Sequence, residues 1–185
     1  MPDEIQPKLS QVINAISEKP ELDNYFSTVI RNIYDLAPPY TYFHYRLLHK
    51  EVQNSAKTHY IAKDYYSAFQ EAMKRYKNAF KDKSGVTASE DKDRVANAFG
   101  KPLETTAHFR TRPNGQPFSK QTLDNVAEGQ KMLSMGIVSG GRNIVSHEEH
   151  RDLMNSGLFT EKDCLDLLGL LSHLFKRLDE SDKRT

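Results

Sequence analysis

The sequence predicts an all-α protein. Apolar residues recur every three or four positions through most of the chain, which is the spacing of one face of an α-helix. Prolines and glycines interrupt these stripes at intervals that suit helices of ordinary length. Only residues 101–118 lack the helical period. There we expect no more than one short hairpin, turning at Pro113, Asn114 and Gly115.

The first 55 residues are expected to be an N-terminal helical extension. Residues 9–16 and 22–34 each carry an apolar helical stripe that a proline ends. Residues 40–52 then mix aromatic and basic side chains, a combination that can form a stacking platform for single-stranded RNA. We favour the alternative that these side chains pack one helix against another.

A long helix is expected over residues 58–81, ended by Ser84 and Gly85, and a shorter one follows over 89–99. The polar face of the long helix carries Lys74, Arg75, Lys77, Lys81 and Lys83. Such a cluster can steer a phosphate backbone, although many charge runs are only solvated faces. Lys74 and Lys77 are therefore candidate RNA contacts.

The next expected helix starts at Ser119 and ends beyond Gly141. Its apolar stripe is formed by Leu123, Val126, Ala127, Leu133, Ile137, Gly141, Ile144 and Val145. Glycine weakens a helix, so the pair Gly140-Gly141 suggests close approach of another backbone at this level. In the loop before the helix, Arg110 and Arg112 are candidate substrate contacts.

The last expected helix begins with a variant capping box, in which Asp163 takes the place of the usual Glu or Gln three residues after Thr160. Its apolar seam suits tight helix pairing, within the fold or between subunits. The seam residues are Cys164, Leu168, Leu171, Phe175 and Leu178. Residues 181–185 are expected to be a frayed tail.

Composition sets few limits on function. Charged residues make up 28% of the 185 residues and nearly balance, with a formal net charge of +1, so bulk charge indicates no class of partner. Cys164 is the one cysteine, which fits a reducing cytoplasm. No apolar run reaches the length of a membrane span, and the first residues lack the pattern of a signal peptide. We expect a cytoplasmic protein without a membrane anchor.

The stretch with the clearest chemical potential contains Arg142, Asn143 and His147. Cleavage of RNA without a metal needs a base for the 2′-hydroxyl, an acid for the leaving oxygen and positive charge on the phosphate. Histidine titrates near neutral pH, arginine matches phosphate with a planar fork, and asparagine can orient either group. One chain offers one such histidine, so two proton transfers favour a composite site across a two-fold dimer.

Other interpretations of this stretch remain open. Arg142 can cap carbonyl groups at the helix end while His147 is an ordinary surface histidine. A metal site is disfavoured because His147 and His150 are three positions apart, whereas the zinc-protease pattern needs four. Cys164 lies in an apolar seam and is a poor nucleophile candidate. We expect neither a metal nor another cofactor.

The motif resembles the signature of the HEPN superfamily (higher eukaryotes and prokaryotes nucleotide-binding). Within it, the chain is most similar to the Ymh-type family of prokaryotic hypothetical proteins. Two features carry this likeness. Residues 59–72 have Tyr and Ala at the positions typical of the family, and they are followed in order by a short helix, a loop, the helix that ends in the motif and a leucine-rich helix. The resemblance covers about residues 58–178 and implies a HEPN-like catalytic domain over 56–180.

This resemblance implies an antiparallel helical bundle that dimerises through its motif helices, with two motifs facing each other. It implies a metal-independent endoribonuclease that binds RNA, often a toxin held by an antitoxin or an antiphage-defence effector. Arg142, Asn143 and His147 would be the catalytic set and Glu71 an auxiliary group. Ile144 replaces a common proline, and Glu149 replaces a tyrosine that some antitoxins modify. The alternative is a non-catalytic HEPN module that binds RNA, nucleotide or a partner protein.

Overall fold

The computed structural model has an all-α fold, as the sequence predicts. It describes residues 39–88, 90–99, 102–106, 111–141 and 149–183. The chain divides into two compact units, residues 1–41 and 42–185. The helices expected over 9–16 and 22–34 lie outside the described residues.

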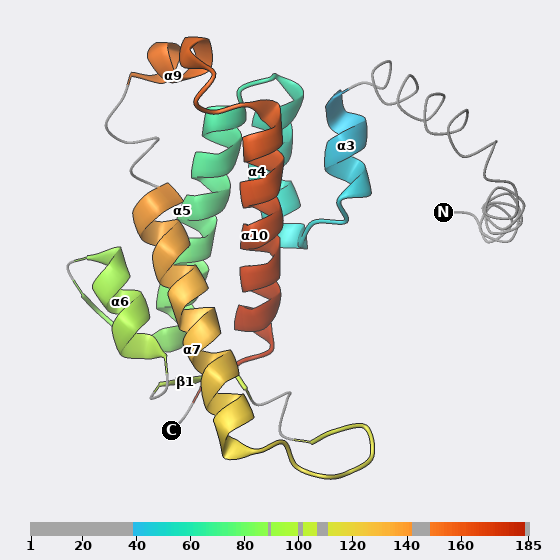
Figure 1. The fold of residues 1–185 in the computed structure, drawn as a ribbon. Helices are drawn as coiled ribbons and strands as arrows, with labels where there is room; N and C mark the ends of the chain where they lie inside the picture. Colours follow the sequence, from blue (N-terminus) through green and yellow to red (C-terminus); the bar gives the residue numbers. More distant parts are fainter. Residues whose placement is uncertain (1–38, 89, 100–101, 107–110, 142–148, 184–185) are drawn as a thin grey trace, which may run out of the picture. The chain divides into compact units, whose positions relative to one another are not determined.

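The second unit is a bundle of helices with a small two-stranded sheet (Figure 1). Helix α5 packs against both α4 and α10, while α7 contacts α6 and α10. No helix in the described ranges is long and apolar enough to cross a bilayer. The elements are α3 (Pro39–Tyr45), α4 (Lys50–Ile61), α5 (Tyr65–Ser84), α6 (Asp91–Ala98), β1 (Leu103–Glu104), α7 (Lys120–Gly136), the π-helical turn η2 (Ile137–Gly141), α9 (His150–Ser156), α10 (Glu161–Asp179) and β2 (Asp182–Lys183).

The helix expected over residues 58–81 is two helices in the structure. Helix α4 ends before a turn in which Lys63 has a φ of 60°, a conformation that turns the chain back. Asp64 then starts α5, because its Oδ1 accepts a hydrogen bond of 3.0 Å from the backbone N–H of Ser67. The C-terminal end of α5 agrees with the sequence, since Gly85 caps it in the left-handed conformation.

Helix α4 belongs to the core of the bundle. Its Val52, Ala56 and Tyr60 are fully buried, and they recur every four residues along one face. The domain boundary expected after residue 55 therefore falls inside α4, and the compact unit begins at residue 42. The expected boundary differs from the observed one because the sequence pattern assigns the last residues of α4 to the helix expected over residues 58–81.

The centre of the core is the apolar seam of α10. All the seam residues predicted from the sequence are buried, namely Cys164, Leu168, Leu171, Phe175 and Leu178. Thr160 and Asp163 form the predicted capping box at its start. The seam packs against α4 and α5 of the same chain.

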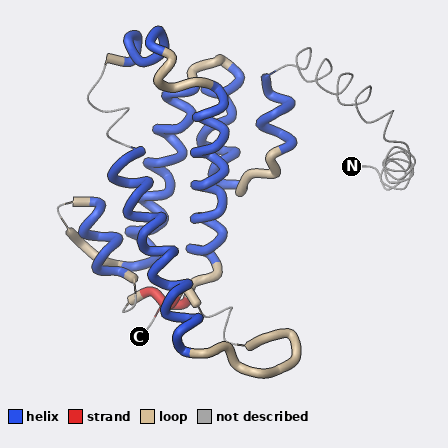
Figure 2. Tube along the Cα trace, viewed as in Figure 1, coloured by secondary structure: helices blue, strands red, loops and turns tan. Residues whose placement is uncertain are grey.

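The sheet pairs two segments that are far apart in the sequence. Leu103 lies opposite Lys183 and Glu104 opposite Asp182, in antiparallel register. Figure 2 shows this sheet at one end of the bundle. The tail expected to be frayed from residue 181 thus contributes a strand, because β1 offers backbone groups that it can bond.

In the described part of residues 101–118, the arms of the expected hairpin meet in a bridge between Thr111 and Pro117. The turn lies where the sequence predicts it: the N–H of Arg112 donates to the carbonyl of Gln116 at 2.8 Å, and Gly115 has a φ of 81°.

Candidate functional site

Helix α7 leads to the motif and ends in the π-helical turn η2, whose last residue directly precedes Arg142. Ser119 caps α7 as predicted, accepting a hydrogen bond of 3.2 Å from the N–H of Thr122. Short π-helical turns are rare and frequently occur at functional sites. Arg142, Asn143 and His147 themselves lie outside the described residues.

The buried face of α7 is more polar than the sequence suggests. Gln130 and Ser134 are buried, whereas Leu133, expected to point inward, is 43% exposed. The Ser134 hydroxyl lies 2.9 Å from the hydroxyl of Tyr76 on α5. Burial raises the pKa of Tyr76 to about 12, and the bond to Ser134 offsets part of that rise. A buried hydrogen bond therefore joins α7 to the centre of the bundle.

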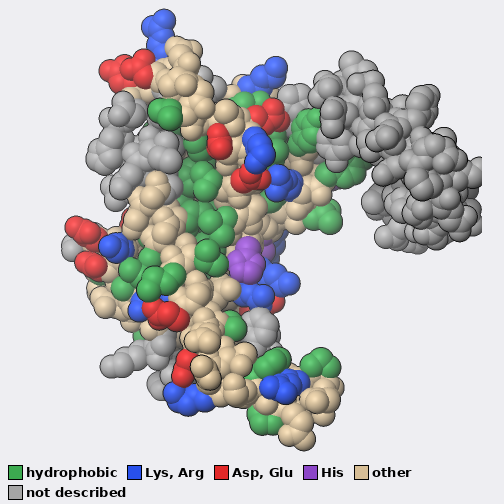
Figure 3. All heavy atoms as spheres, in the orientation of Figure 1, with side chains coloured by type: hydrophobic (Ala, Val, Ile, Leu, Met, Phe, Trp, Pro, Cys, Tyr) green, Lys and Arg blue, Asp and Glu red, His purple; other side chains and the backbone are tan. Residues whose placement is uncertain are grey.

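The exposed face of α7 carries small and apolar residues. A Cβ added at Gly129, Gly136 or Gly140 would meet no described atom within 4 Å. Among the described residues, none makes the close approach expected at Gly140. Met132 and Leu133 lie exposed on the same helix. Figure 3 also shows hydrophobic side chains reaching the surface between α7 and α10.

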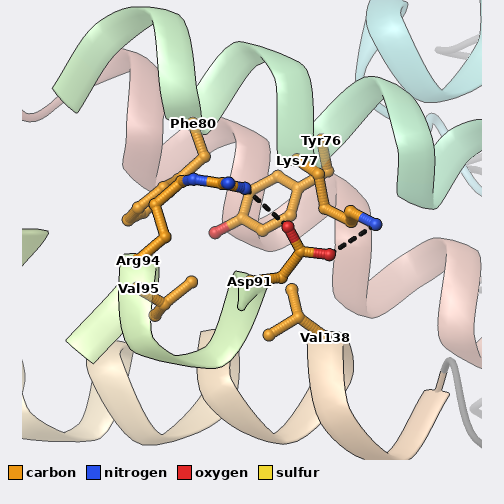
Figure 4. Close-up of a pocket in the computed structure, with 7 residues that line it drawn as sticks. All are labelled: Tyr76, Lys77, Phe80, Asp91, Arg94, Val95 and Val138. Atoms are coloured by element: carbon orange, nitrogen blue, oxygen red, sulfur yellow. Dashed lines mark hydrogen bonds and ion pairs between the residues drawn. The ribbon is translucent and has the colours of Figure 1, made fainter. Parts of the chain in front are cut away.

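Beside η2, a carboxylate joins two cations (Figure 4). Asp91 Oδ1 lies 2.5 Å from Arg94 Nη1, and Asp91 Oδ2 lies 2.5 Å from Lys77 Nζ. Burial alone would raise the pKa of the Asp91 carboxyl, but the hydrogen bonds and charges of Lys77 and Arg94 outweigh it and lower the pKa. Val138 of η2 lines the same small pocket. Lys77, predicted as an RNA contact, thus holds α6 against α5 next to the end of the motif helix.

A second polar contact joins α7 to α10. Gln130 Nε2 lies 3.2 Å from His173 Nε2. Burial lowers the pKa of His173, and the positive charges of Arg177 and Lys176 lower it further. The neutral imidazole can accept the hydrogen bond from the Gln130 amide.

Glu71 and Lys74 line a groove between α4 and α5, and Lys77 is not among its lining residues. The groove has a volume of about 560 Å³. Glu71 Oε1 and Lys74 Nζ are 2.6 Å apart, and Arg75 Nε lies 2.6 Å from Glu51 Oε2. We call this the α4/α5 groove; its lining residues are Asn54, Ser55, Thr58, His59, Glu71, Lys74, Arg75 and Asn78.

The basic residues of the loop before α7 are only partly described. The Arg112 guanidinium lies over the Phe118 ring, 5.2 Å from its centroid, and both side chains remain accessible to solvent. Arg110, the other predicted loop contact, lies outside the described residues.

The aromatic and basic stretch before α4 is only partly packed against the bundle. Phe43 is buried, whereas His44, Tyr45 and Arg46 are exposed. The His49 ring stacks on Phe175 with centroids 5.1 Å apart, and its Nε2 lies 3.0 Å from Asp179 Oδ2.

Sequence reasoning missed Asp91 and Arg94. Their spacing of three on a helix was a signal for an ion pair, but nothing local pointed to Lys77 as a second partner. Within the described ranges, no group of three or more His, Cys, Asp or Glu side chains is arranged to hold a metal ion.

Comparison with known proteins agrees with part of the resemblance. No curated protein and no solved structure matches the chain. Residues 46–178 match the model of a family described as "Protein of unknown function (Hypoth_ymh)". The match begins just before α4 and ends one residue before the end of α10, so it spans the helical bundle. The chain therefore belongs to the Hypoth_ymh family.

Proposed function

We propose that the protein is a metal-independent endoribonuclease of the HEPN type that acts as a homodimer in the cytoplasm. The proposal rests on one observation: Arg142-Asn143, three further residues and His147 follow directly on the end of a long helix. This arrangement resembles the HEPN signature. The all-α fold and the π-helical turn before Arg142 support the proposal.

In the proposed reaction, the 2′-hydroxyl attacks the neighbouring phosphorus and the bond from phosphorus to the 5′-oxygen breaks. The products are a 2′,3′-cyclic phosphate and a free 5′-hydroxyl. His147 of one subunit would take the proton of the 2′-hydroxyl, and the partner subunit's His147 would donate one to the 5′-oxygen. Arg142 would stabilise the charge on the non-bridging oxygens, and Asn143 would orient the phosphate or the imidazole.

The exposed face of α7 supports a dimer through the motif helices. Gly129, Gly136 and Gly140 leave room for another backbone, and Met132 and Leu133 offer apolar surface. Helices whose faces carry small residues can approach one another closely. A two-fold axis at this face would bring two copies of the motif to one site.

The test is RNA cleavage by the purified protein in the presence of EDTA. We expect wild-type protein to release products with cyclic phosphate ends. His147→Ala and Arg142→Ala should each lower the rate by roughly 10²–10⁴-fold. His150→Ala, three positions further on, is the matched control and should cleave like wild type. Cleavage that EDTA abolishes, or that survives in His147→Ala, would contradict the proposal.

We further propose that the activity serves as a toxin or antiphage-defence effector that an antitoxin or other protein restrains. Expression of wild-type protein alone should then stop bacterial growth, whereas expression of His147→Ala should not. Equal growth with both proteins would contradict this role.

The second candidate function is a non-catalytic module that binds RNA, nucleotide or a partner protein. The α4/α5 groove favours it, because every residue that lines it carries a polar side chain and it lies on helices that do not carry the motif. Binding without cleavage by wild-type protein would select this function.

A further inference from the structure

The α4/α5 groove is large enough to hold part of a ligand. Its volume of about 560 Å³ falls within the range of about 300–1,000 Å³ typical of ligand sites. Small-molecule sites are mostly lined by apolar and aromatic side chains. This groove is lined by amide, hydroxyl, imidazole and charged groups instead, so it suits a hydrated, charged ligand.

Two cationic side chains of the groove, Lys74 and Arg75, form ion pairs that are exposed to solvent. The side chain of Lys74 is 59% exposed beside Glu71, and that of Arg75 is 46% exposed beside Glu51. Ion pairs this exposed contribute little to the stability of the fold. A phosphate group could therefore replace either carboxylate at little cost, and it would gain a charge-assisted hydrogen bond.

Other polar groups of the groove remain available. Within the described part of the chain, the side chains of Asn54, Thr58 and Asn78 form no hydrogen bond. These groups can both donate and accept, as ribose hydroxyls do. The Glu71 carboxylate of the lining can also accept a hydrogen bond from a 2′-hydroxyl, whereas the ionised carboxylates of an acidic peptide have no hydrogen to donate.

We propose that the α4/α5 groove binds the sugar–phosphate backbone of single-stranded RNA, with Lys74 and Arg75 on successive phosphates and Asn54, Thr58 and Asn78 on the riboses. The choice of RNA rests on the proposed function. The groove would be an anchoring site on helices other than the one that leads to the motif, so it would hold the strand without touching the scissile bond.

The test measures the binding of a fluorescent single-stranded RNA 12-mer to His147→Ala protein by anisotropy, at several salt concentrations. Lys74→Gln with Arg75→Gln should weaken binding by roughly tenfold and reduce the log–log salt slope by about 1.4, or about 0.7 for each phosphate that is no longer neutralised. Glu71→Gln should tighten binding, because it frees Lys74. The exposed positions of these residues should leave thermal unfolding unchanged.

The matched control is Lys162→Gln with Arg46→Gln. These two residues also form exposed ion pairs, both with Asp166, and they lie outside the groove. Loss of affinity equal to that of the groove variant would overturn the proposal, and so would wild-type affinity in the groove variant. The same binding assay is repeated with unlabelled RNA, AMP or a polyglutamate peptide as competitor. The proposal would also be overturned if AMP or the peptide displaced the labelled RNA at the same molar concentration as unlabelled RNA does.

Cleavage is scored separately, with wild-type catalytic residues. If wild-type protein fails to cut RNA but RNA binding still depends on Lys74 and Arg75, the groove proposal is supported and the nuclease proposal is wrong. If cleavage depends on His147, and neither cleavage nor RNA binding depends on Lys74 and Arg75, the nuclease proposal is supported and the groove proposal is wrong.

Discussion

The hydroxyl oxygen of Tyr76 lies 2.9 Å from that of Ser134, and both side chains are buried. The bond links the central helix α5 to α7, which leads to the motif. The inner face of α7 carries two buried polar residues, Gln130 and Ser134, so its position depends on polar contacts as well as on apolar area.

Removal of one partner of this bond should destabilise the protein. Tyr76→Phe leaves the Ser134 hydroxyl buried without its partner, which costs about 1–3 kcal/mol. Adding Ser134→Ala should recover most of that loss, because no unsatisfied group remains. Urea unfolding of the two single variants and the double variant measures both effects. Strictly additive losses would show that the two hydroxyls do not interact.

Asp91→Asn should lower the free energy of unfolding by about 1–2 kcal/mol at pH 7, because the charge-assisted hydrogen bonds to Lys77 and Arg94 are removed. The folded state lowers the pKa of Asp91, so the unfolded chain takes up the proton first as the pH falls. The advantage of wild type should be complete above about pH 4 and should disappear as the pH falls through the folded pKa. Unfolding curves at a series of acidic pH values test this, with the exposed Asp93→Asn as the control.

His173 should make the bundle less stable in mild acid. Its pKa is lowered in the folded state, so below the ordinary value of 6.5 the unfolded chain binds the proton more readily. Stability should fall as the pH drops from 7 through that region, and this part of the loss should be absent in His173→Gln. An NMR titration of the imidazole gives the direct measurement. A pKa at or above 6.5 would contradict the expectation.

Leu133→Glu should prevent dimer formation if α7 forms the interface. The side chain is 43% exposed in the single chain, so the substitution should cost little in the fold itself. A charge at the centre of an apolar contact would be desolvated without a partner. Sedimentation should give a dimer for wild type and a monomer for the variant. Leu158→Glu, at another exposed leucine away from α7, should remain a dimer.

Features set by short-range chemistry were predictable from the sequence. The capping box of Thr160 and Asp163, the left-handed Gly85 and the cap at Ser119 each depend on residues within one helical turn. The apolar seam of α10 is long and regular, and the residues that the helical period places on one face are the ones that are buried.

Features set by distant contacts were not predictable in the same way. The break at Lys63 carries neither glycine nor proline, and Asp64 was its only local signal. The strand at Asp182 needs β1 as a partner. In the site, no local pattern could pair Asp91 with Lys77, or assign Ser134 rather than Leu133 to the core, because the packing between helices decides both.

The turn at Ile137–Gly141 also bears on how this family could vary. A π-helical turn accommodates one residue more than regular helical winding, so it has the form of a single-residue insertion. Deletion of Gly140 would restore regular winding and rotate the exit of the chain by about 100° around the helix axis. Changes in length at this point could therefore redirect the segment that follows while every one of its side chains stays the same.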